Sequence, residues 1–270
     1  MYLYLYPDDL HPFRNIDLGR VKMSSRFLRH SSLLLVDSPS HDALIQIYRT
    51  LNVGIMKLLP TLRGETDAMT QAMVEVYERI STQFTPDMQP QYYFSARELS
   101  RWVRGIYEAV ADQDSVIGMV TSTTGTLSFS REELVRVWAH EALRLFCDRL
   151  VESSEQDICK DIIDEVAIKW FANVNHETAL SRPILFSSWL SKVHKSVKKD
   201  ELREFLRARL KSFYEEELDV PLVLFEEVLD HVLRIDRVLR QPMGHCLLVG
   251  DSGKYWDAIF IKYQGLMQSL

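Results

Sequence analysis

The sequence lacks a cationic excess, paired cysteines and any long apolar run. Its 32 Lys and Arg are outnumbered by 38 Asp and Glu, whereas a nucleic-acid surface normally needs clustered positive charge, so no nucleic-acid partner is expected. The three cysteines, at 147, 159 and 246, lack the short paired spacing of zinc or redox sites, which predicts free thiols in a reducing cytosol and no metal. No apolar stretch approaches the roughly 20 residues of a membrane span, so we expect a soluble protein with no membrane partner.

The patterning that is present is mostly helical. The 270 residues are 46% apolar, which is enough for a buried core. Apolar residues recur at three-to-four spacing and predict helices over 44–59, 66–84, 95–110, 130–150 and 225–239. Another helical group, 155–219, is broken at 181–183 and in the basic stretch 192–199. Short apolar runs at 32–37 and 245–249 are typical of buried strands, and a loop is expected at 118–128. The expected fold class is mainly α.

Two serine capping boxes, Ser95 to Glu98 and Ser130 to Glu133, mark helix starts. In each, the serine hydroxyl would accept the N3 amide hydrogen bond while the glutamate reaches back to the serine N–H. Arg97 then stands in a first helical turn, where an exposed cation opposes the macrodipole at a cost on the order of 0.3–1 kcal/mol. A nearby anion would offset this cost. The residues alone favour the other reading, an arginine paired with Glu98, Glu108 or a neighbouring helix, because surface ion pairs are common.

A glycine-containing segment follows the second predicted strand. Gly250, Ser252, Gly253 and Lys254 stand where a phosphate loop lies in nucleotide-binding proteins. The pattern G-x-x-x-x-G-K-[ST] fails in either register, because counting from Gly250 puts two aromatic residues at the required Gly and Lys. The hydroxyl that would bind magnesium is also missing. The segment is interpreted as a degenerate phosphate loop or a plain glycine turn.

Other charged residues have simple interpretations. Arg26 and Arg29 precede the first predicted strand and could contact an anion on a neighbouring subunit, with ordinary solvated charge as the simpler reading. His140-Glu141 lacks the second histidine that a zinc protease needs. The acidic run 215–217 and the lysines of 192–199 are interpreted as solvated faces.

Several blocks resemble the cytoplasmic dynein heavy chain family. They are SRFLRH at 25–30, YFSARELSRWVRG at 93–105, VWAHEALRLF at 137–146, SRPIL at 181–185, FYEEELDVPLVLF at 213–225, DHVLRIDR at 230–237 and RQP at 240–242. The resemblance runs from about Asp17 to Gly253. It implies the following division: a divergent lead-in (1–24), the end of the α/β subdomain of the third AAA+ module (25–62), its helical lid (63–215), the first helix and strand of the fourth module (216–253), and a divergent tail (254–270).

The resemblance also implies roles for individual residues. Arg97 matches the family's second sensor arginine, which contacts nucleotide phosphates, and Arg26, with Arg29 as the alternate, matches the arginine finger that reaches a neighbouring module's nucleotide. The loop flanking the adenine of the fourth module matches Val220, Pro221, Leu222, Val223 and Leu224. The third module's phosphate loop and acidic metal motif are expected upstream of Met1, the Asn-Pro-Pro expected before Asp17 is missing, and similarity to the fourth module's phosphate loop stops at Gly253.

We therefore expect a fragment of a dynein heavy chain-like microtubule motor. The parent would use ATP and magnesium to drive movement, whereas this chain, with no intact Walker A or Walker B motif and no catalytic residue, would hold no cofactor and show no ATPase activity alone. Expected partners are other AAA+ modules and dynein subunits in the cytoplasm and cytoskeleton, with microtubules reached only through parts absent here.

Two alternatives stay open from the sequence. A stand-alone helical protein that binds dynein or AAA+ modules predicts a stable monomer. An NTP-binding protein with a degenerate loop at 250–254 predicts ATP affinity that Lys254→Ala abolishes.

Overall fold

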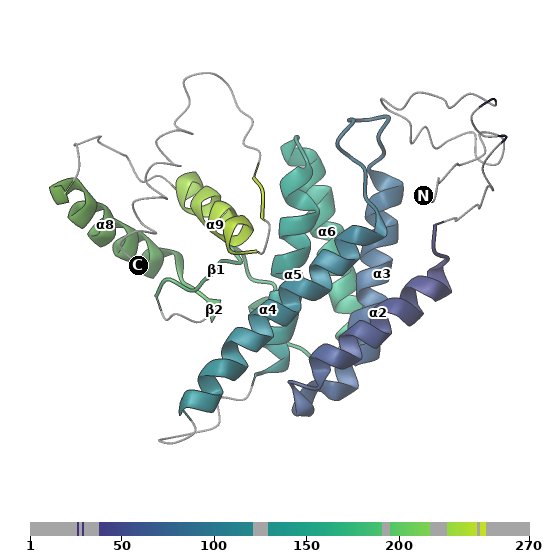
Figure 1. Ribbon diagram of the computed structural model, residues 1–270, viewed down its shortest axis with the longest axis horizontal. Coiled ribbons are helices and arrows are strands. Elements are labelled where there is room, and N and C mark those ends of the chain that lie inside the picture. Colours follow the sequence, from purple (N-terminus) through teal and green to yellow (C-terminus); the bar gives the residue numbers. More distant parts are fainter. Residues whose placement is uncertain are drawn as a thin grey trace.

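The computed structural model describes residues 26, 29, 38–120, 129–190, 195–216, 226–241 and 244–246 (Figure 1). Helices dominate this part of the chain, which confirms the mainly α class. They are α2 (His41–Met56), α3 (Thr66–Gln83), α4 (Ala96–Val120), α5 (Arg131–Leu145), α6 (Ser153–Trp170), α7 (His176–Ala179), α8 (Lys199–Glu216) and α9 (Glu226–Arg240), with the 3-10 helices η1 (Pro60–Glu65) and η2 (Cys147–Arg149).

Local sequence signals explain where several helices begin. The Ser40 hydroxyl caps α2 by accepting from the Ala43 N–H at 3.4 Å. The predicted box at α5 is confirmed: Ser130 Oγ accepts from the Glu133 N–H at 3.1 Å, while the Glu133 carboxylate accepts from the Ser130 N–H at 2.9 Å. A second box, not predicted, joins Glu152 and Glu155 at the start of α6. The predicted starts of α2 and α5 are correct to within three residues, whereas α4 continues ten residues beyond its predicted end at residue 110.

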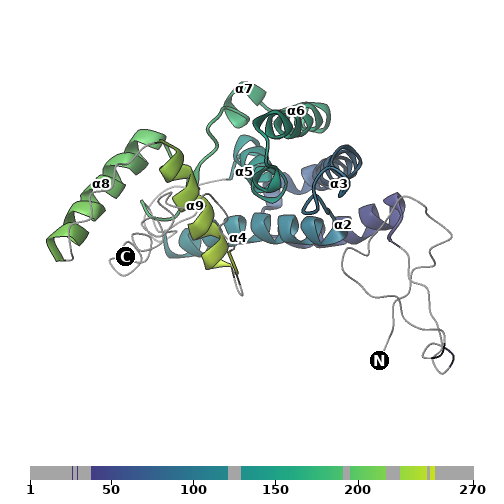
Figure 2. The same ribbon diagram turned by 90° about the horizontal axis from the view of Figure 1, so that it is seen from above.

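The first of two hydrophobic cores lies among α2, α3, α4, α5 and α6 (Figure 2). Its centre is aromatic: the Trp102 ring of α4 lies 5.0 Å from the Trp138 ring of α5, and Trp102 Nε1 donates to the Trp138 carbonyl oxygen at 3.0 Å. Phe146 and Phe171 each pack edge-on against this pair, at 5.5 Å between ring centroids. Because both tryptophans are fully buried, α4 is held in one position against α5.

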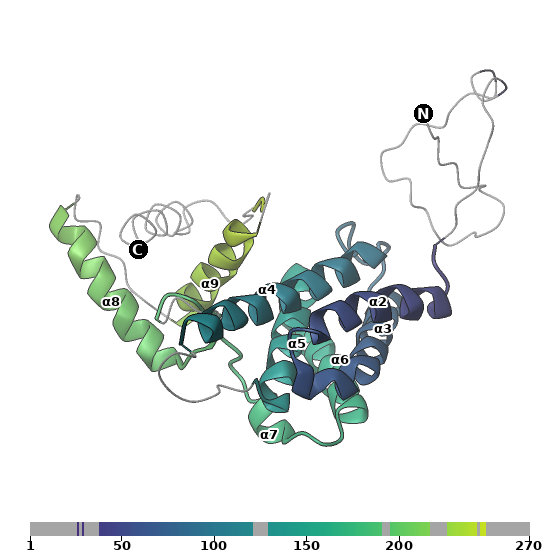
Figure 3. The same cartoon turned by 60° about the horizontal axis from the view of Figure 1, so that its bottom comes forward.

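A second, smaller core lies around α8 and α9, to one side of the first bundle (Figure 3). It includes Leu202 and Leu206 of α8 and Leu229, Val232 and Leu233 of α9. The extended segment 184–186 lies between the two cores. Ile184 and Phe186 belong to the first core and Leu185 to the second, as expected where successive side chains of an extended segment point to opposite faces.

A two-stranded antiparallel sheet begins in this segment and was not predicted. β1 (Phe186–Ser187) pairs with β2 (Lys195–Ser196), with Phe186 opposite Ser196. The basic stretch 192–199, interpreted as a break and a solvated face, therefore contributes a short strand, although Lys195 and Ser196 are indeed exposed. Two residues per strand are too few for alternation to show in a sequence.

Other predictions fall partly or wholly outside the described residues. The strand at 32–37 lies there, as do 121–128 of the predicted loop, whereas residues 118–120 belong to α4. His245 and Cys246 are not in a strand, and 247–249 are not described. All three cysteines are free thiols, with Cys147 and Cys159 buried. Among the described residues, every helix is too short or too polar to cross a membrane.

Candidate functional site

Arg97 is exposed in the first turn of α4, and no ion pair or side-chain hydrogen bond is found for its guanidinium among the described residues. Both carboxylates proposed as its partners are engaged elsewhere. Glu98 contacts Arg149 at 3.1 Å and Arg101 at 3.9 Å, and Glu108 contacts Arg104 at 2.9 Å. The pairing interpretation is therefore wrong for both, and no carboxylate of the described residues offsets the unfavourable position of Arg97 against the helix dipole.

The cap that precedes Arg97 differs from the predicted box in one respect. The Ser95 N–H donates to Glu98 Oε2 at 2.8 Å, as predicted. The Ser95 hydroxyl, however, donates to that same oxygen at 2.9 Å and accepts the Arg97 N–H at 3.4 Å. The Glu98 N–H instead bonds the Ser95 carbonyl at 3.0 Å. The glutamate is buried at 4% exposure, and its carboxylate draws the serine hydroxyl toward itself.

Arg149, in η2, clamps the segment that leads into α4. Its Nη1 donates to the Tyr93 carbonyl oxygen at 2.6 Å, its Nη2 to Glu98 Oε1 at 3.1 Å, and its guanidinium lies 4.9 Å from the centre of the Phe94 ring. Burial alone would raise the pKa of Glu98, but the hydrogen bonds from Ser95 and Arg149 outweigh it and leave that pKa below its usual range. The carboxylate is therefore ionised at neutral pH.

Two tyrosines fix the same segment from other sides. The Tyr48 hydroxyl of α2 donates to the Ala96 carbonyl oxygen at 2.5 Å and lies 3.0 Å from Ser100 Oγ. The Tyr92 hydroxyl donates to the Glu155 carboxylate of α6 and accepts the Val151 N–H at 2.9 Å. The first turn of α4 is thus held by α2 and η2, and the segment that leads into it is held by α6.

Two further guanidiniums gather at the residue that follows Arg97: those of Arg101 and Arg149 both contact the carboxylate of Glu98. An unpaired guanidinium on a fixed backbone suits a planar, anionic group such as a phosphate. The donor set is cationic and therefore does not suit a metal ion. Elsewhere in the described chain, no group of three or more His, Cys, Asp or Glu is placed to hold a metal.

The structure says less about the other predicted site residues. Arg26 is helical, Arg29 lies in a turn, and both are exposed. The adenine-flanking residues 220–224 and the glycine segment 250–254 lie outside the described residues.

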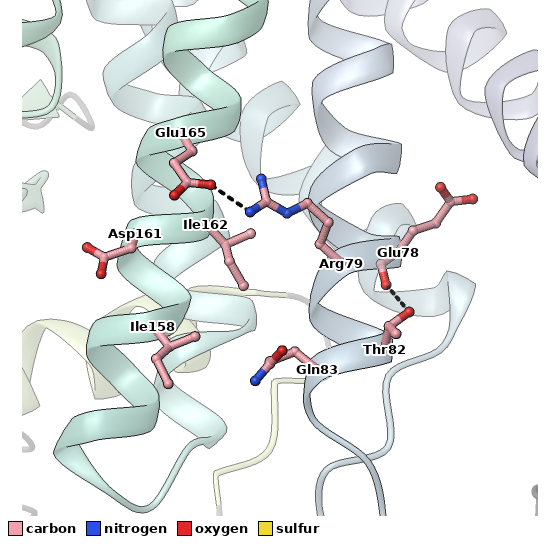
Figure 4. A pocket seen from close by; sticks show the side chains of 8 residues that line it. All are labelled: Glu78, Arg79, Thr82, Gln83, Ile158, Asp161, Ile162 and Glu165. Atoms are coloured by element: carbon pink, nitrogen blue, oxygen red, sulfur yellow. Dashed lines mark hydrogen bonds and ion pairs between the residues drawn. The ribbon is translucent and has the colours of Figure 1, made fainter.

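A separate groove of about 590 Å³ lies between α3 and α6 (Figure 4). Ile158 and Ile162 line it from α6, and the ion pair between Arg79 and Glu165 spans it at 2.6 Å. Its lining residues contribute nothing to the clamp around Arg97.

A buried ionic contact joins α5 to α9. Arg237 of α9 donates through both Nε (3.1 Å to Oε1) and Nη2 to the carboxylate of Glu141, which is 2% exposed. His140 Nδ1 lies 3.0 Å from the same carboxylate. Burial alone would raise the pKa of Glu141, but Arg237 and His140 outweigh it and lower that pKa well below its usual range. Burial lowers the pKa of His140 to about 4, so the neutral ring donates to Glu141.

A second contact between these elements is a ring of four alternating charges. Arg144 of α5 contacts Asp148 of η2 at 3.4 Å and Asp230 of α9 at 3.3 Å. Arg234 of α9 contacts the same two carboxylates, Asp148 at 3.5 Å and Asp230 more closely. We call this set together with Glu141 and Arg237 the ionic junction. It was not predicted, because its members lie up to 96 residues apart and nothing in the local pattern pairs them.

Comparison with known proteins gives these elements a family. The profile "Dynein heavy chain, ATPase lid domain" matches residues 51–156, and "P-loop containing dynein motor region D4" matches 220–256. The first range holds Arg97, α5 and η2, and the second holds α9. The ionic junction therefore joins residues of the first matched region to residues of the second.

Curated relatives extend the match over most of the chain. "Dynein heavy chain, cytoplasmic" of Dictyostelium discoideum is 56% identical and that of Drosophila melanogaster 54%, each over 237 residues, which is 88% of this chain and 5% of the relative. "Dynein heavy chain-like protein 1" of Plasmodium falciparum is 43% identical over 88% of this chain and 4% of its own length. The chain thus spans about 5% of the length of the first relatives. Over the part that it spans, this chain belongs to the dynein heavy chain family.

Proposed function

We propose that this chain supplies the helical lid of one AAA+ module and the first helix of the next to a cytoplasmic, dynein-type microtubule motor. Within it, Arg97 is the sensor arginine with which the lid contacts nucleotide phosphates. The observation that carries the proposal is the exposed guanidinium of Arg97, which has no partner among the residues that the structure describes, on a tightly clamped helix start. The names of relatives such as "Dynein heavy chain, cytoplasmic" support the proposed motor and its location.

The clamp matters because a sensor must be placed accurately. A long arginine side chain on a mobile loop would lose most of its binding energy in ordering that loop. Here the backbone of the first turn is fixed before any ligand arrives, so only the side chain of Arg97 must be ordered. The carboxylates of Glu98 and Glu108 already form ion pairs with Arg149 and Arg104, which leaves the guanidinium of Arg97 available to a phosphate.

The remaining site assignments belong to the same proposal. Arg26, or Arg29 in its place, would reach the nucleotide of a neighbouring module. Residues 220–224 would flank the adenine of the next module, and 250–254 would form a degenerate phosphate loop. Phosphoryl transfer needs a phosphate cradle, a held magnesium ion and a positioned water. In this proposal ATP and magnesium are cofactors of the assembled motor, and its other AAA+ modules and dynein subunits are the partners of this chain.

A direct test replaces the homologous segment of the Dictyostelium dynein heavy chain with this chain. Arg97→Ala should weaken binding of a fluorescent ADP analogue to the lid's module by about 10- to 100-fold, the range expected for one hydrogen bond to a charged group. Arg97→Lys should recover part of the loss, because lysine keeps the charge but not the planar fork. Arg104→Ala is the matched control, since it removes an exposed arginine of the same helix that already has a carboxylate partner.

Equal affinities for Arg97→Ala and Arg104→Ala would overturn the assignment. For the chain by itself, we expect ATP turnover at background. Robust turnover that Arg97→Ala abolishes would instead show a self-sufficient nucleotide site.

A further inference from the structure

Two consecutive residues of η2 hold different parts of the molecule. Asp148 lies in the ring of four charges and contacts Arg234 of α9 at 3.5 Å. Arg149, next in sequence, contacts the Tyr93 carbonyl oxygen and the Glu98 carboxylate. One turn of 3-10 helix therefore connects α9 with the clamped start of α4.

This turn is itself firmly held. Phe146, just before it, is fully buried and packs against the rings of Trp102 and Phe94, at 5.5 and 5.6 Å between centroids. Cys147 is buried as well, and the Leu150 N–H closes the turn onto the Cys147 carbonyl at 3.0 Å. Because packed side chains fix both flanks, a displacement at Asp148 is passed to Arg149 rather than absorbed between them.

The way in which α9 is attached to the first bundle makes a displacement at Asp148 possible. The apolar residues of α9 pack into the second core with α8, and not into the first core. Long arginine and aspartate side chains of the ionic junction join α9 to α5 and η2. A shift of α9 relative to the first bundle is thus transmitted to that bundle through charged side chains. One of them, Arg234, contacts Asp148 of η2.

We propose that η2 couples α9 to Arg97, with Asp148 and Arg149 as positioning residues. When α9 is seated on Asp148, Arg149 holds the Tyr93 carbonyl and Glu98, and the first turn of α4 is fixed. When α9 moves away, the hold of Arg149 weakens and the first turn loosens. The mechanism of this coupling is argued from the contacts alone. Its consequence, that the first helix of the second module sets nucleotide affinity in the first module, rests on the proposed function of Arg97.

The test is hydrogen exchange on the purified 270-residue chain. Arg234→Gln removes the direct contact between α9 and Asp148 and substitutes no residue of α4. We expect amide exchange at Ser95, Arg97 and Glu98 to rise about three- to tenfold, as these N–H groups bond only within the cap. Arg79→Gln is the matched control, because it removes an arginine of similar exposure, 39% against 33% for Arg234, from an ion pair across the α3–α6 groove (Figure 4). It should leave these three amides unchanged.

A general loss of stability would raise exchange everywhere, so the amides of α3 serve as the internal reference. Asp148→Asn is the second variant: it weakens the η2 side of the link and leaves the Arg234–Asp230 pair in place. Faster exchange confined to α9 in both variants would overturn the coupling. In the chimera used above, Arg234→Gln should also weaken ADP-analogue binding several-fold, whereas Arg79→Gln should not.

The two proposals fail in different ways. If Arg97→Ala leaves nucleotide affinity unchanged while Arg234→Gln still loosens the α4 cap, the sensor assignment is wrong and the coupling stands. If Arg97→Ala weakens binding while Arg234→Gln changes neither the cap nor the affinity, the coupling is wrong and the sensor stands.

Discussion

Gly105→Ala, in the middle of α4, tests how firmly the buried carboxylate of Glu141 is held. A Cβ atom added to Gly105 would lie 2.0 Å from Glu141 Oε2 and 2.6 Å from its Cδ, far inside contact distance. A flexible glutamate on a surface could swing away. This one is buried at 2% exposure and bound by Arg237 and His140, so moving it means giving up those contacts.

Two opposing effects set the size of the change. Alanine is the better helix former by about 0.8–1 kcal/mol in a helix interior. Displacing the Glu141 carboxylate from Arg237 disrupts a buried ion pair, which typically costs about 3–5 kcal/mol. The second effect is larger, so the free energy of unfolding should fall by about 2–4 kcal/mol.

Urea unfolding of the purified chain, followed by circular dichroism, measures this difference. Gly54→Ala in α2 is the matched control, because an added Cβ there has no atom within 4 Å. That variant should gain up to about 1 kcal/mol from helix propensity alone. In a Glu141→Ala background the clash is gone, and Gly105→Ala should then become neutral or stabilising. If Gly105→Ala stabilises the chain with Glu141 intact, the carboxylate is not held as the contacts indicate.

Two further predictions concern the same chain. Ser130→Ala removes the hydroxyl half of the α5 capping box and should lower the free energy of unfolding by about 1 kcal/mol, whereas equal urea midpoints would contradict the cap. His140 has a native pKa of about 4 against 6.5 ordinarily, so the unfolded state binds more protons between these values and stability falls as pH drops from 6.5 toward 4. His140→Gln should remove that part of the loss, on the order of 3 kcal/mol, while a pH profile of unfolding identical to that of the parent chain would contradict it.

The sequence predicted the features that depend on neighbours along the chain. Apolar spacing located α2, α3, α5 and α9, and the Ser130 box was right because cap and acceptor are three residues apart. Gly105 carried an unused signal, since glycine inside an amphipathic helix often marks a close approach of another group. The electrostatically unfavourable position of Arg97 in a first helical turn could also be predicted from the sequence. Its role as a sensor arginine came from the family resemblance and stays a prediction.

The contacts that fix the site were beyond local reasoning. Arg149 reaches Glu98 from 51 residues away, and Arg237 reaches Glu141 from 96. A helical pattern says which face is polar but not which opposite charge will lie across from it. The same limit explains one wrong partner proposed for Arg97: Glu98 is the next residue, yet tertiary packing gives its carboxylate to Arg149. Glu108 instead pairs with Arg104, four residues earlier on the same helix, a contact that helical spacing could have indicated.

The use of charge at the ionic junction is informative in itself. Burying an ion pair such as Glu141–Arg237 requires desolvation of both groups, and an apolar contact of equal size is often as stabilising or more so. Stability alone therefore does not account for this choice. Apolar faces, however, tolerate sliding, whereas a guanidinium with two directed hydrogen bonds to one carboxylate accepts a single pose. The ionic junction links α5 and η2, which border the first core, to α9, whose buried residues belong to the second core, so a few directed bonds contribute to the orientation of α9. We infer that the charges serve to hold α9 in register with α5 and η2, which is the property a coupling between two modules requires.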